Sequence, residues 1–440
     1  MEFQSRRDVL KLLGIAGVGA AAAACGFGAT GTKGASGAIV SAAEPTQPIT
    51  IEFWRRNYAK GGVNADSITT DAAIAAFQRR YPNITVVPVG DPVGPATNQK
   101  YDIAILQQGA GPDVFSSTGP ELTKYAKAGK LAVPDVTDRG AYDTAVIEAS
   151  LVNNQLAGYP LWVVPWFQYI NPTQFKEAGI ATPPSTGWTI DSFQEATRAL
   201  TGGGKHGWAF YSTDYSFMIN DGARPVNSEQ TKWTFSSPDA ASSLNRWGQI
   251  VKDGGAAPGV VSFAYADSVN VFKNGSVGIL QNPSALATEL IGSDEWTYGT
   301  NWDVVASPVG KVAQTTWGAL GYVGVLAQDN AEKVAAAQLF GQYISGPEIG
   351  EDLKATNVQW WQAPAAMLTA RSAFADYHPS KAKIASFLDG EVYIQPNLQK
   401  WTQIDTQYLG PARDSVITGQ ESAETALDRI STPAQQLVDS

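Results

Sequence analysis

The sequence predicts an α/β fold with more than one sheet, and three observations lead to this prediction. Short segments rich in β-branched residues, such as residues 49–54 (ITIEFW), alternate with segments whose apolar residues recur at helical spacing. Strand, helix and strand in succession are typical of parallel strands joined by helical crossovers. The length of 440 residues exceeds what one core usually holds, so more than one domain is expected.

The first 24 residues predict a signal peptide. Arg6 and Arg7 precede an apolar stretch of thirteen residues, 12–24, which is shorter than the ~20 residues that a membrane span needs. The adjacent arginines resemble the twin-arginine export signal, by which a protein crosses the membrane already folded. The sequence therefore predicts export.

Cys25 is the single cysteine and directly follows the apolar stretch. Residues 22–25 (AAAC) resemble a lipobox, so we expect the Cys25 thiol to carry lipid and to hold the protein on the outer face of the cytoplasmic membrane. The alternative is a buried structural cysteine. Residues 25–48 are rich in Gly, Ala, Ser and Thr, which is typical of a flexible tether.

The expected elements follow in order after the tether. Alternation and β-branched content predict strands at residues 49–54, 84–89 and 113–115. Helical spacing of apolar residues and capping signals predict helices at residues 71–80, 101–107, 191–200, 239–252, 331–345 and 423–437. The apolar segment 159–170 (YPLWVVPWFQYI) holds two prolines and therefore cannot form one regular helix.

Composition disfavours several classes of function. The formal net charge of −10 is opposite to that of a nucleic-acid-binding protein. One cysteine excludes a multi-cysteine zinc site, and His206 and His378 lie far apart in the sequence. No Gly-x-Ser-x-Gly motif or phosphate-binding glycine loop is present, because Gly202-Gly203-Gly204-Lys205 lacks the required spacing. We therefore expect no cofactor, no metal and no enzymatic activity.

The order of several short motifs resembles that of one family over nearly the whole chain after the tether. The motifs are FW at 53–54, FQRRYPNITV at 77–86, GAGPDV at 109–114, YAKAGKL at 125–131, GYP at 158–160, YINPTQFKEAG at 169–179, PPSTGWT at 183–189, WTFSSPDA at 233–240 and SGPE at 345–348. Together they resemble extracellular solute-binding proteins of ABC importers, of the type that includes maltose-binding and other sugar-binding proteins.

This resemblance implies a two-lobed periplasmic-binding-protein-like fold of type II. Each lobe would be a mixed, mostly parallel sheet flanked by helices, with the ligand cleft between the lobes. Residues 49–163 plus 321–368 would form the N-terminal lobe, and residues 164–320 plus 369–440 the C-terminal lobe. Strands would cross between lobes near residues 161–166, 317–321 and 367–370. The implied partners are a carbohydrate and the permease subunits of an ABC transporter, and the implied state is a monomer.

Candidate ligand contacts combine aromatic rings with short polar side chains, because a sugar presents both C–H faces and hydroxyl groups. Gln281-Asn282-Pro283-Ser284 resembles a Gly-Pro-Trp loop of the family, with Ser284 in place of the tryptophan, and Trp317 is the expected substitute. The resemblance implies the following contacts: Trp54, Arg56, Asn57, Ser117, Thr118, Trp162, Trp166, Asn282, Trp317, Trp360, Trp361 and Trp401.

Two kinds of alternative stay open at this point. Each of these tryptophans could be a core residue instead of a ligand contact. The protein has the alternatives of a secreted carbohydrate-active enzyme, which needs two carboxylates flanking the cleaved bond, or of a surface sugar sensor without a transporter. For the enzyme, Glu148, Asp214 and Asp267 are candidate carboxylates.

Overall fold

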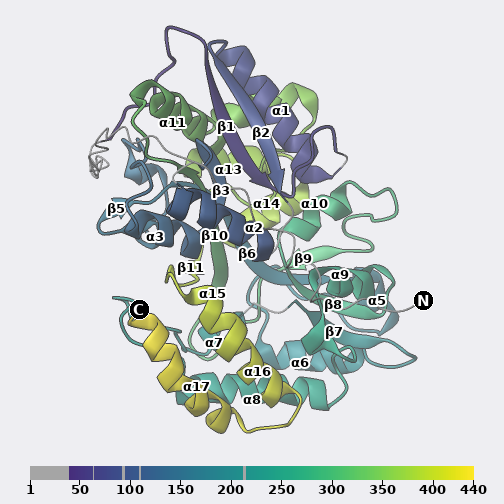
Figure 1. Ribbon diagram of the computed structural model, residues 1–440. Coiled ribbons are helices and arrows are strands. Elements are labelled where there is room, and N and C mark those ends of the chain that lie inside the picture. The colour runs from purple at the N-terminus through teal and green to yellow at the C-terminus, as the bar shows by residue number, and fades with distance from the viewer. Residues whose placement is uncertain (1–38, 63, 92–94, 109–110, 212–214) are drawn as a thin grey trace, which may run out of the picture. The chain divides into compact units, whose positions relative to one another are not determined.

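One nine-stranded mixed β-sheet organises the part of the chain that this computed structural model describes (Figure 1). The described residues are 39–440 without 63, 92–94, 109–110 and 212–214, and they belong to one unit, Gly34–Ser440. The expected signal peptide, Cys25 and most of the tether therefore lie outside the described residues. None of the described helices is long and apolar enough to cross a membrane.

The strands of the main sheet follow the order β2-β1-β3-β10-β6-β8-β7, while β11 pairs with β10 and β9 with β6. A separate hairpin consists of β4 (Leu151–Val152) and β5 (Gln155–Leu156). The bounds of the main strands are β1 Ile49–Arg56, β2 Ile84–Asp91, β3 Val114–Thr118, β6 Tyr159–Ile170, β7 His206–Phe210, β8 Val277–Pro283, β9 Asp303–Val305, β10 Thr315–Val325 and β11 Glu391–Ile394.

Two long strands, β6 and β10, join the two ends of the sheet. β10 pairs with β3 on one side and with β6 on the other, and β6 continues into pairs with β8 and β9. The segment 159–170 is therefore a strand despite its two prolines, and nearly all of its residues are buried. A strand buried on both faces reads as a continuous apolar run rather than as an alternating pattern, so periodicity does not indicate it, and only the family resemblance predicts a crossing strand here, near residues 161–166.

The helices surround this sheet. Their bounds are α1 Ala65–Arg80, α2 Pro95–Asp102, α3 Gly119–Lys127, α4 Thr144–Ala149, α5 Pro172–Glu177, α6 Ile190–Ala199, α7 Ser216–Asn220, α8 Pro238–Lys252, α9 Tyr265–Lys273, α10 Ala285–Ile291, α11 Ala331–Ser345, α12 Glu348–Leu353, α13 Leu368–Ala375, α14 Pro379–Ser386, α15 Trp401–Ile404, α16 Gly410–Ile417 and α17 Ala423–Val438. Two π-helical segments, Ile103–Gln108 and Asp405–Leu409, follow α2 and α15. Single 3-10 turns occur at Arg139–Ala141, Val260–Ser262 and Lys354–Thr356.

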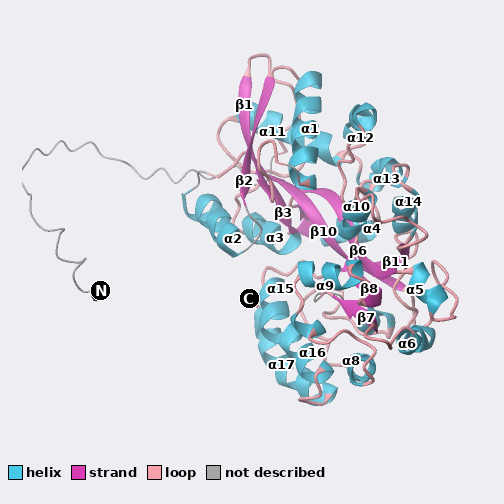
Figure 2. Cartoon of the chain, turned by 90° about the vertical axis from the view of Figure 1, so that its right-hand side faces the viewer, coloured by secondary structure: helices cyan, strands magenta, loops and turns pink. Residues whose placement is uncertain are grey.

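Packing divides these helices between the two ends of the sheet. At one end, α1 contacts β2, α11 contacts β1, and the two helices contact each other. At the other end, α16 and α17 contact α8 (Figure 2). At the second end, the Trp208 ring of β7 lies 5.7 Å from the Trp247 ring of α8. Many of the aromatic side chains are buried in contacts of this kind.

Most predicted helices are confirmed within one residue at each end, but three predictions need correction. Helix α1 begins at Ala65 rather than at 71, because Asn64 caps it by accepting a hydrogen bond from the Ser67 amide at 2.8 Å. The predicted helix 101–107 is the end of α2 followed by a π-helical segment. Residues 367–370, expected as a crossing strand, instead begin helix α13, for which Met367 is the N-cap.

Candidate functional site

The carboxyl ends of β1 and β3 lie side by side. The two strands are parallel neighbours, with Phe53 opposite Val114 and Trp54 opposite Phe115. Their carboxyl ends therefore point the same way, which is where ligands bind in open α/β sheets. Five predicted site residues belong to these two strand ends: Trp54, Arg56, Asn57, Ser117 and Thr118.

One carboxylate, Glu121, contacts three of these residues. Arg56 Nη2 donates to Glu121 Oε1 at 2.7 Å, and the hydroxyls of Ser117 and Thr118 donate to Oε2 at 3.3 Å each. Glu121 is the third residue of α3, where its carboxylate also accepts from the Thr118 amide in a capping box. Sequence reasoning missed Glu121, although Thr118 followed by Glu121 is a capping-box signal.

A second carboxylate, Asp66, accepts hydrogen bonds from another set of side chains. Asp66 Oδ1 accepts from Arg55 Nη2 at 2.7 Å and from Gln362 Nε2 at 2.8 Å, while Oδ2 accepts from Asn57 Nδ2 at 2.7 Å. Arg55 is only 4% exposed. Burial lowers the pKa of Arg55, and the Asp66 carboxylate acts in the opposite direction. The sequence predicted only Asn57 in this group.

Trp54 is enclosed by its neighbours rather than presented to solvent. Its indole N–H donates to Glu52, the Lys100 ammonium lies 4.3 Å from the ring centroid, and the Tyr101 ring lies 5.0 Å away. In this structure packing therefore accounts for Trp54.

Trp166, Trp317 and Asn282 come from β6, β10 and β8. Trp166 is paired with Pro283, and Asn282 with Phe167, so Trp166 and Asn282 occupy adjacent positions across the two strands. The Nε1 atoms of Trp166 and Trp317 and the Oδ1 atom of Asn282 have no hydrogen-bond partner among the described residues. Asn282 Nδ2 donates to Ser268 Oγ at 2.9 Å. Successive side chains of a strand point to opposite faces, so Trp166 and Asn282 lie on opposite faces of the sheet. Each orphaned buried atom is a group that a hydroxyl of a ligand could pair on its own face.

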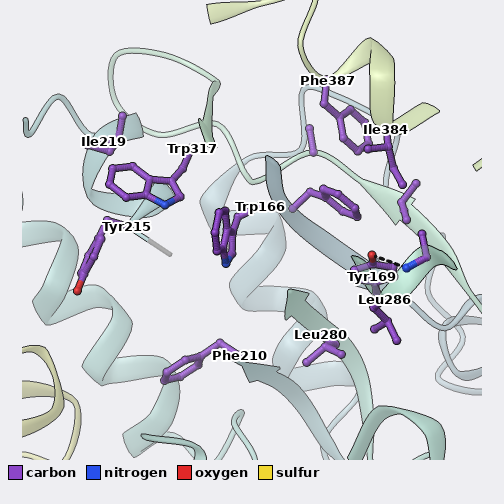
Figure 3. Packing of buried hydrophobic residues seen from close by; sticks show 14 of the residues in the cluster. Trp166, Tyr169, Phe210, Tyr215, Ile219, Leu280, Leu286, Trp317, Ile384 and Phe387 are labelled. Atoms are coloured by element: carbon purple, nitrogen blue, oxygen red, sulfur yellow. Dashed lines mark hydrogen bonds between the residues drawn. The ribbon is translucent and has the colours of Figure 1, made fainter. Parts of the chain in front are cut away.

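Trp317 is also the centre of an aromatic cluster. Figure 3 shows Trp317 with Tyr215 on one side and Trp166 on the other. The Tyr215 ring meets Trp317 edge-on at 5.6 Å, Tyr393 stacks on it at 5.7 Å, and Trp401 lies at 6.4 Å. The structure thus brings Trp317 and Trp401 together, with both side chains buried.

A partly buried carboxylate, Asp405, contacts this cluster. Asp405 begins the π-helical segment after α15 and accepts a hydrogen bond from the Tyr215 hydroxyl. Burial raises the pKa of Asp405, which the Tyr215 hydrogen bond opposes. π-Helical segments are frequent at functional sites. No sequence signal pointed to Asp405.

Trp360 and Trp361 lie in the loop before α13, and both side chains are buried in the core. Trp360 is 2% exposed, and its Nε1 donates to the Ile344 carbonyl at 2.7 Å. Trp361 is fully buried, and a Cβ added at Gly350 would lie 2.9 Å from its ring. Packing accounts for both side chains in this structure.

Trp162 differs from the other predicted tryptophans, because it alone among them is partly exposed. It lies on β6 opposite Gly321 of β10, and the Arg55 guanidinium lies 5.2 Å from its ring centroid. The described residues contain no group of three His, Cys, Asp or Glu side chains that could hold a metal ion. The site thus combines one accessible aromatic ring, two arginines in ion pairs and several hydroxyl and amide groups.

Comparison with known proteins decides the family. Residues 72–356 match the bacterial extracellular solute-binding protein family. The chain belongs to this family. A binding protein of Brucella abortus is 23% identical over 310 residues, which cover 68% of this solute-binding protein and 72% of that relative.

Solved structures agree with this assignment at the level of the fold. An ABC substrate-binding protein of Listeria monocytogenes in complex with cycloalternan has a TM-score of 0.72 and 19% identity, covering 89% of this chain and 99% of that one. The GacH receptor of Streptomyces glaucescens, solved unliganded and with acarbose, has a TM-score of 0.71 and 17% identity, with 88% and 98% covered. Maltose-bound MalE3 of Thermotoga maritima has a TM-score of 0.70 and 17% identity, with 88% and 100% covered.

The fold is therefore that of the two-lobed ABC substrate-binding proteins, and the predicted fold and family are confirmed. The family and these neighbours are binding proteins rather than enzymes. The family is also extracellular, in agreement with the predicted export.

Proposed function

We propose that this solute-binding protein captures an uncharged mono- or oligosaccharide and delivers it to the permease subunits of an ABC transporter. The observation that carries the proposal is the grouping at the ends of β1 and β3, where Ser117, Thr118 and Asn57 lie at strand ends next to Arg55, whose guanidinium is 5.2 Å from the centroid of the partly exposed Trp162 ring. A ring and short hydrogen-bonding groups together match the C–H faces and hydroxyls of a sugar.

The charges of this grouping favour a neutral ligand. Arg55 and Arg56 each form an ion pair, with Asp66 and Glu121 respectively, at 2.7 Å. A guanidinium that already has a carboxylate partner has little net charge to offer a phosphate or a uronate. The remaining N–H groups of Arg56 can still donate to hydroxyl oxygens. We therefore expect discrimination against anionic sugars.

We propose two roles for the predicted site residues. Trp162, Arg56, Asn57, Ser117, Thr118, Trp166, Asn282 and Trp317 contact ligand, the last three once the protein closes around it. The buried residues Trp54, Trp360, Trp361 and Trp401 support this surface from behind. This division is supported by the burial of the second group and by the orphaned polar atoms of Trp166, Asn282 and Trp317.

We further propose that residues 49–163 plus 321–368 and residues 164–320 plus 369–440 are the two lobes, which close by a hinge. Support comes from β6 and β10, because these two strands connect pairs at both ends of the sheet. A permease distinguishes the loaded protein only if ligand favours one conformation. The protein acts in this scheme as a monomer and catalyses no reaction.

The proposed location rests on the N-terminal segment. Residues 1–24 direct export through the twin-arginine route, Cys25 carries lipid, and residues 25–48 tether the binding domain to the outer face of the cytoplasmic membrane. A tether of this composition leaves the binding domain free to reach the permease.

Thermal unfolding of the lipid-free protein with single ligands tests the proposed function. Maltose, acarbose and cycloalternan are the sugar probes, glucose 6-phosphate and glucuronate the anionic controls, and a dipeptide the unrelated control. Ligand at 100 times its dissociation constant adds about 2.7 kcal/mol, which raises Tm by a few degrees. We expect a shift with a neutral sugar only, and recovery of that sugar unchanged. A shift with the dipeptide alone, or recovery of a hydrolysed sugar, would contradict the proposal.

A further inference from the structure

The orientation of the Trp162 ring depends on a residue that the proposed ligand contacts do not include. Trp162 is the partly exposed tryptophan of the site, and its position on β6 coincides with a register shift against β10 between Gly321 and Tyr322. A register shift bends the strand and re-aims its side chains, so regular strand pairing alone does not define the orientation of this ring. Other contacts must then define its orientation.

Arg55 provides such a contact, because its guanidinium lies close to two indole rings. The guanidinium carbon is 5.2 Å from the centroid of the Trp162 ring and 5.7 Å from that of Trp360. Both distances are within the ~6 Å over which a cation is attracted to an aromatic face. Trp360 cannot shift easily, since its Nε1 is bonded to the buried Ile344 carbonyl at 2.7 Å. Arg55 therefore links a fixed indole to an accessible one.

Asp66 anchors Arg55 from the edge of the guanidinium plane. Nη2 donates to Asp66 Oδ1 at 2.7 Å, and the same carboxylate is held by Gln362 Nε2 at 2.8 Å and Asn57 Nδ2 at 2.7 Å. A planar guanidinium bonded at its edge keeps its two faces for stacking. The anchor joins β1, α1 and the loop before α13, so the position of Arg55 is set from three elements.

Gly321 also restricts the position of the Trp162 ring. A Cβ added at Gly321 would lie 1.9 Å from Trp162 Nε1, so the indole nitrogen lies directly against the glycine. The ring is then held by Arg55 and by its close contact with Gly321. Arg55 and Gly321 cover part of the Trp162 ring, and the rest of the ring is exposed.

We propose that Arg55 is a positioning residue, which holds the Trp162 indole in the orientation that contacts ligand, with Asp66 as its anchor. The contact with ligand rests on the proposed function, whereas the orientation of the ring does not. Arg55 itself acts through Trp162 and not through the ligand.

Fluorine NMR of the protein labelled with fluorotryptophan tests this proposal without any ligand. The resonance that disappears in Trp162→Phe identifies Trp162, and the one that disappears in Trp360→Phe identifies Trp360. In Arg55→Met we expect the Trp162 resonance to shift by more than its line width and to broaden, and the Trp360 resonance to shift as well. Arg55→Lys keeps the charge without the planar fork, so we expect it to restore the wild-type position only in part.

Arg80→Met is the matched control, since Arg80 also pairs with an aspartate, Asp352, and lies 6.0 Å from an aromatic ring, Tyr343. It should leave the Trp162 resonance in place. An unchanged Trp162 resonance in Arg55→Met would overturn the proposal. If Arg55→Met does not fold, Asp66→Asn replaces it, and an unchanged Trp162 resonance in that variant overturns the proposal equally. If no sugar raises Tm, the proposed function fails while this measurement keeps its meaning.

Discussion

Gly321 and Trp162 face each other across β10 and β6 so closely that Gly321 has no room for a side chain. The distance from a Cβ at Gly321 to Trp162 Nε1 would be 1.9 Å, and the next ring atoms would lie at 2.5 and 2.6 Å. The position of the Trp162 ring therefore leaves room only for glycine at residue 321. The ring is also the accessible aromatic surface of the proposed site.

Gly321→Ala should displace the Trp162 ring and destabilise the fold by about 1–3 kcal/mol, as overpacking usually does. Affinity for a sugar that raises Tm should fall in the same variant. Urea unfolding and titration calorimetry measure the two effects. Gly390→Ala is the control, because an added Cβ there would meet nothing within 4 Å, and its effect should stay within about 0.5 kcal/mol. Equal effects of the two substitutions would contradict the prediction.

Trp162 and Trp360 should respond differently to substitution although one arginine contacts both. Trp162→Ala removes a partly exposed ring, so we expect a clear loss of sugar affinity with little loss of stability. Trp360→Phe removes a buried hydrogen bond to Ile344, so we expect a loss of about 1–3 kcal/mol in stability with affinity retained. Urea unfolding and calorimetry on both variants distinguish the roles. Retained affinity in Trp162→Ala would remove this residue from the site.

Glu121→Gln should release the charge of Arg56, because the ion pair at 2.7 Å is replaced by a neutral contact. Glutamine preserves the capping role at the start of α3. We expect neutral-sugar affinity to fall about tenfold and the preference against glucuronate to weaken, as measured by calorimetry. Glu351→Gln breaks the exposed pair with Lys354 and should change neither binding nor stability measurably. If Glu121→Gln kept the wild-type preference for neutral sugar over glucuronate, the ion pair of Arg56 would not be the cause of that preference.

Lys381 should make stability depend on pH between pH 7 and pH 10. It is 1% exposed, and its Nζ donates to the Trp361 carbonyl at 3.3 Å. Burial lowers the pKa of Lys381 from 10.5 to about 7. Between these values the unfolded chain holds a proton that the folded protein lacks, so raising the pH favours the folded state.

The matched variant for this effect is Lys381→Met. Relative to it, wild-type stability should increase by about 1.4 kcal/mol for each pH unit from pH 7 toward pH 10, and the difference should be constant below pH 7. Urea unfolding followed by circular dichroism at several pH values measures this. Parallel pH profiles of the two proteins would show that Lys381 keeps its ordinary pKa.

Several features could be predicted from the sequence because they are encoded locally. Helix α11 occupies residues 331–345 as predicted, since Asn330 supplies a cap and apolar residues recur at helical spacing. The family could be predicted as well, because its motifs are short and keep a fixed order. The apolar segment of β6, by contrast, has no period that distinguishes a strand from a buried helix.

Contacts between residues distant in the chain depend on tertiary structure. Asp66 meets Gln362 across 296 residues, and Gly321 meets Trp162 because β10 lies next to β6. The sequence showed thirteen tryptophans but not which of them face solvent. Burial depends on which elements pack together, and this is set by the register of β3, β10, β6 and β8. Local sequence patterns specify the helices, their caps and the order of the family motifs along the chain. Strand pairing determines which side chains form the site.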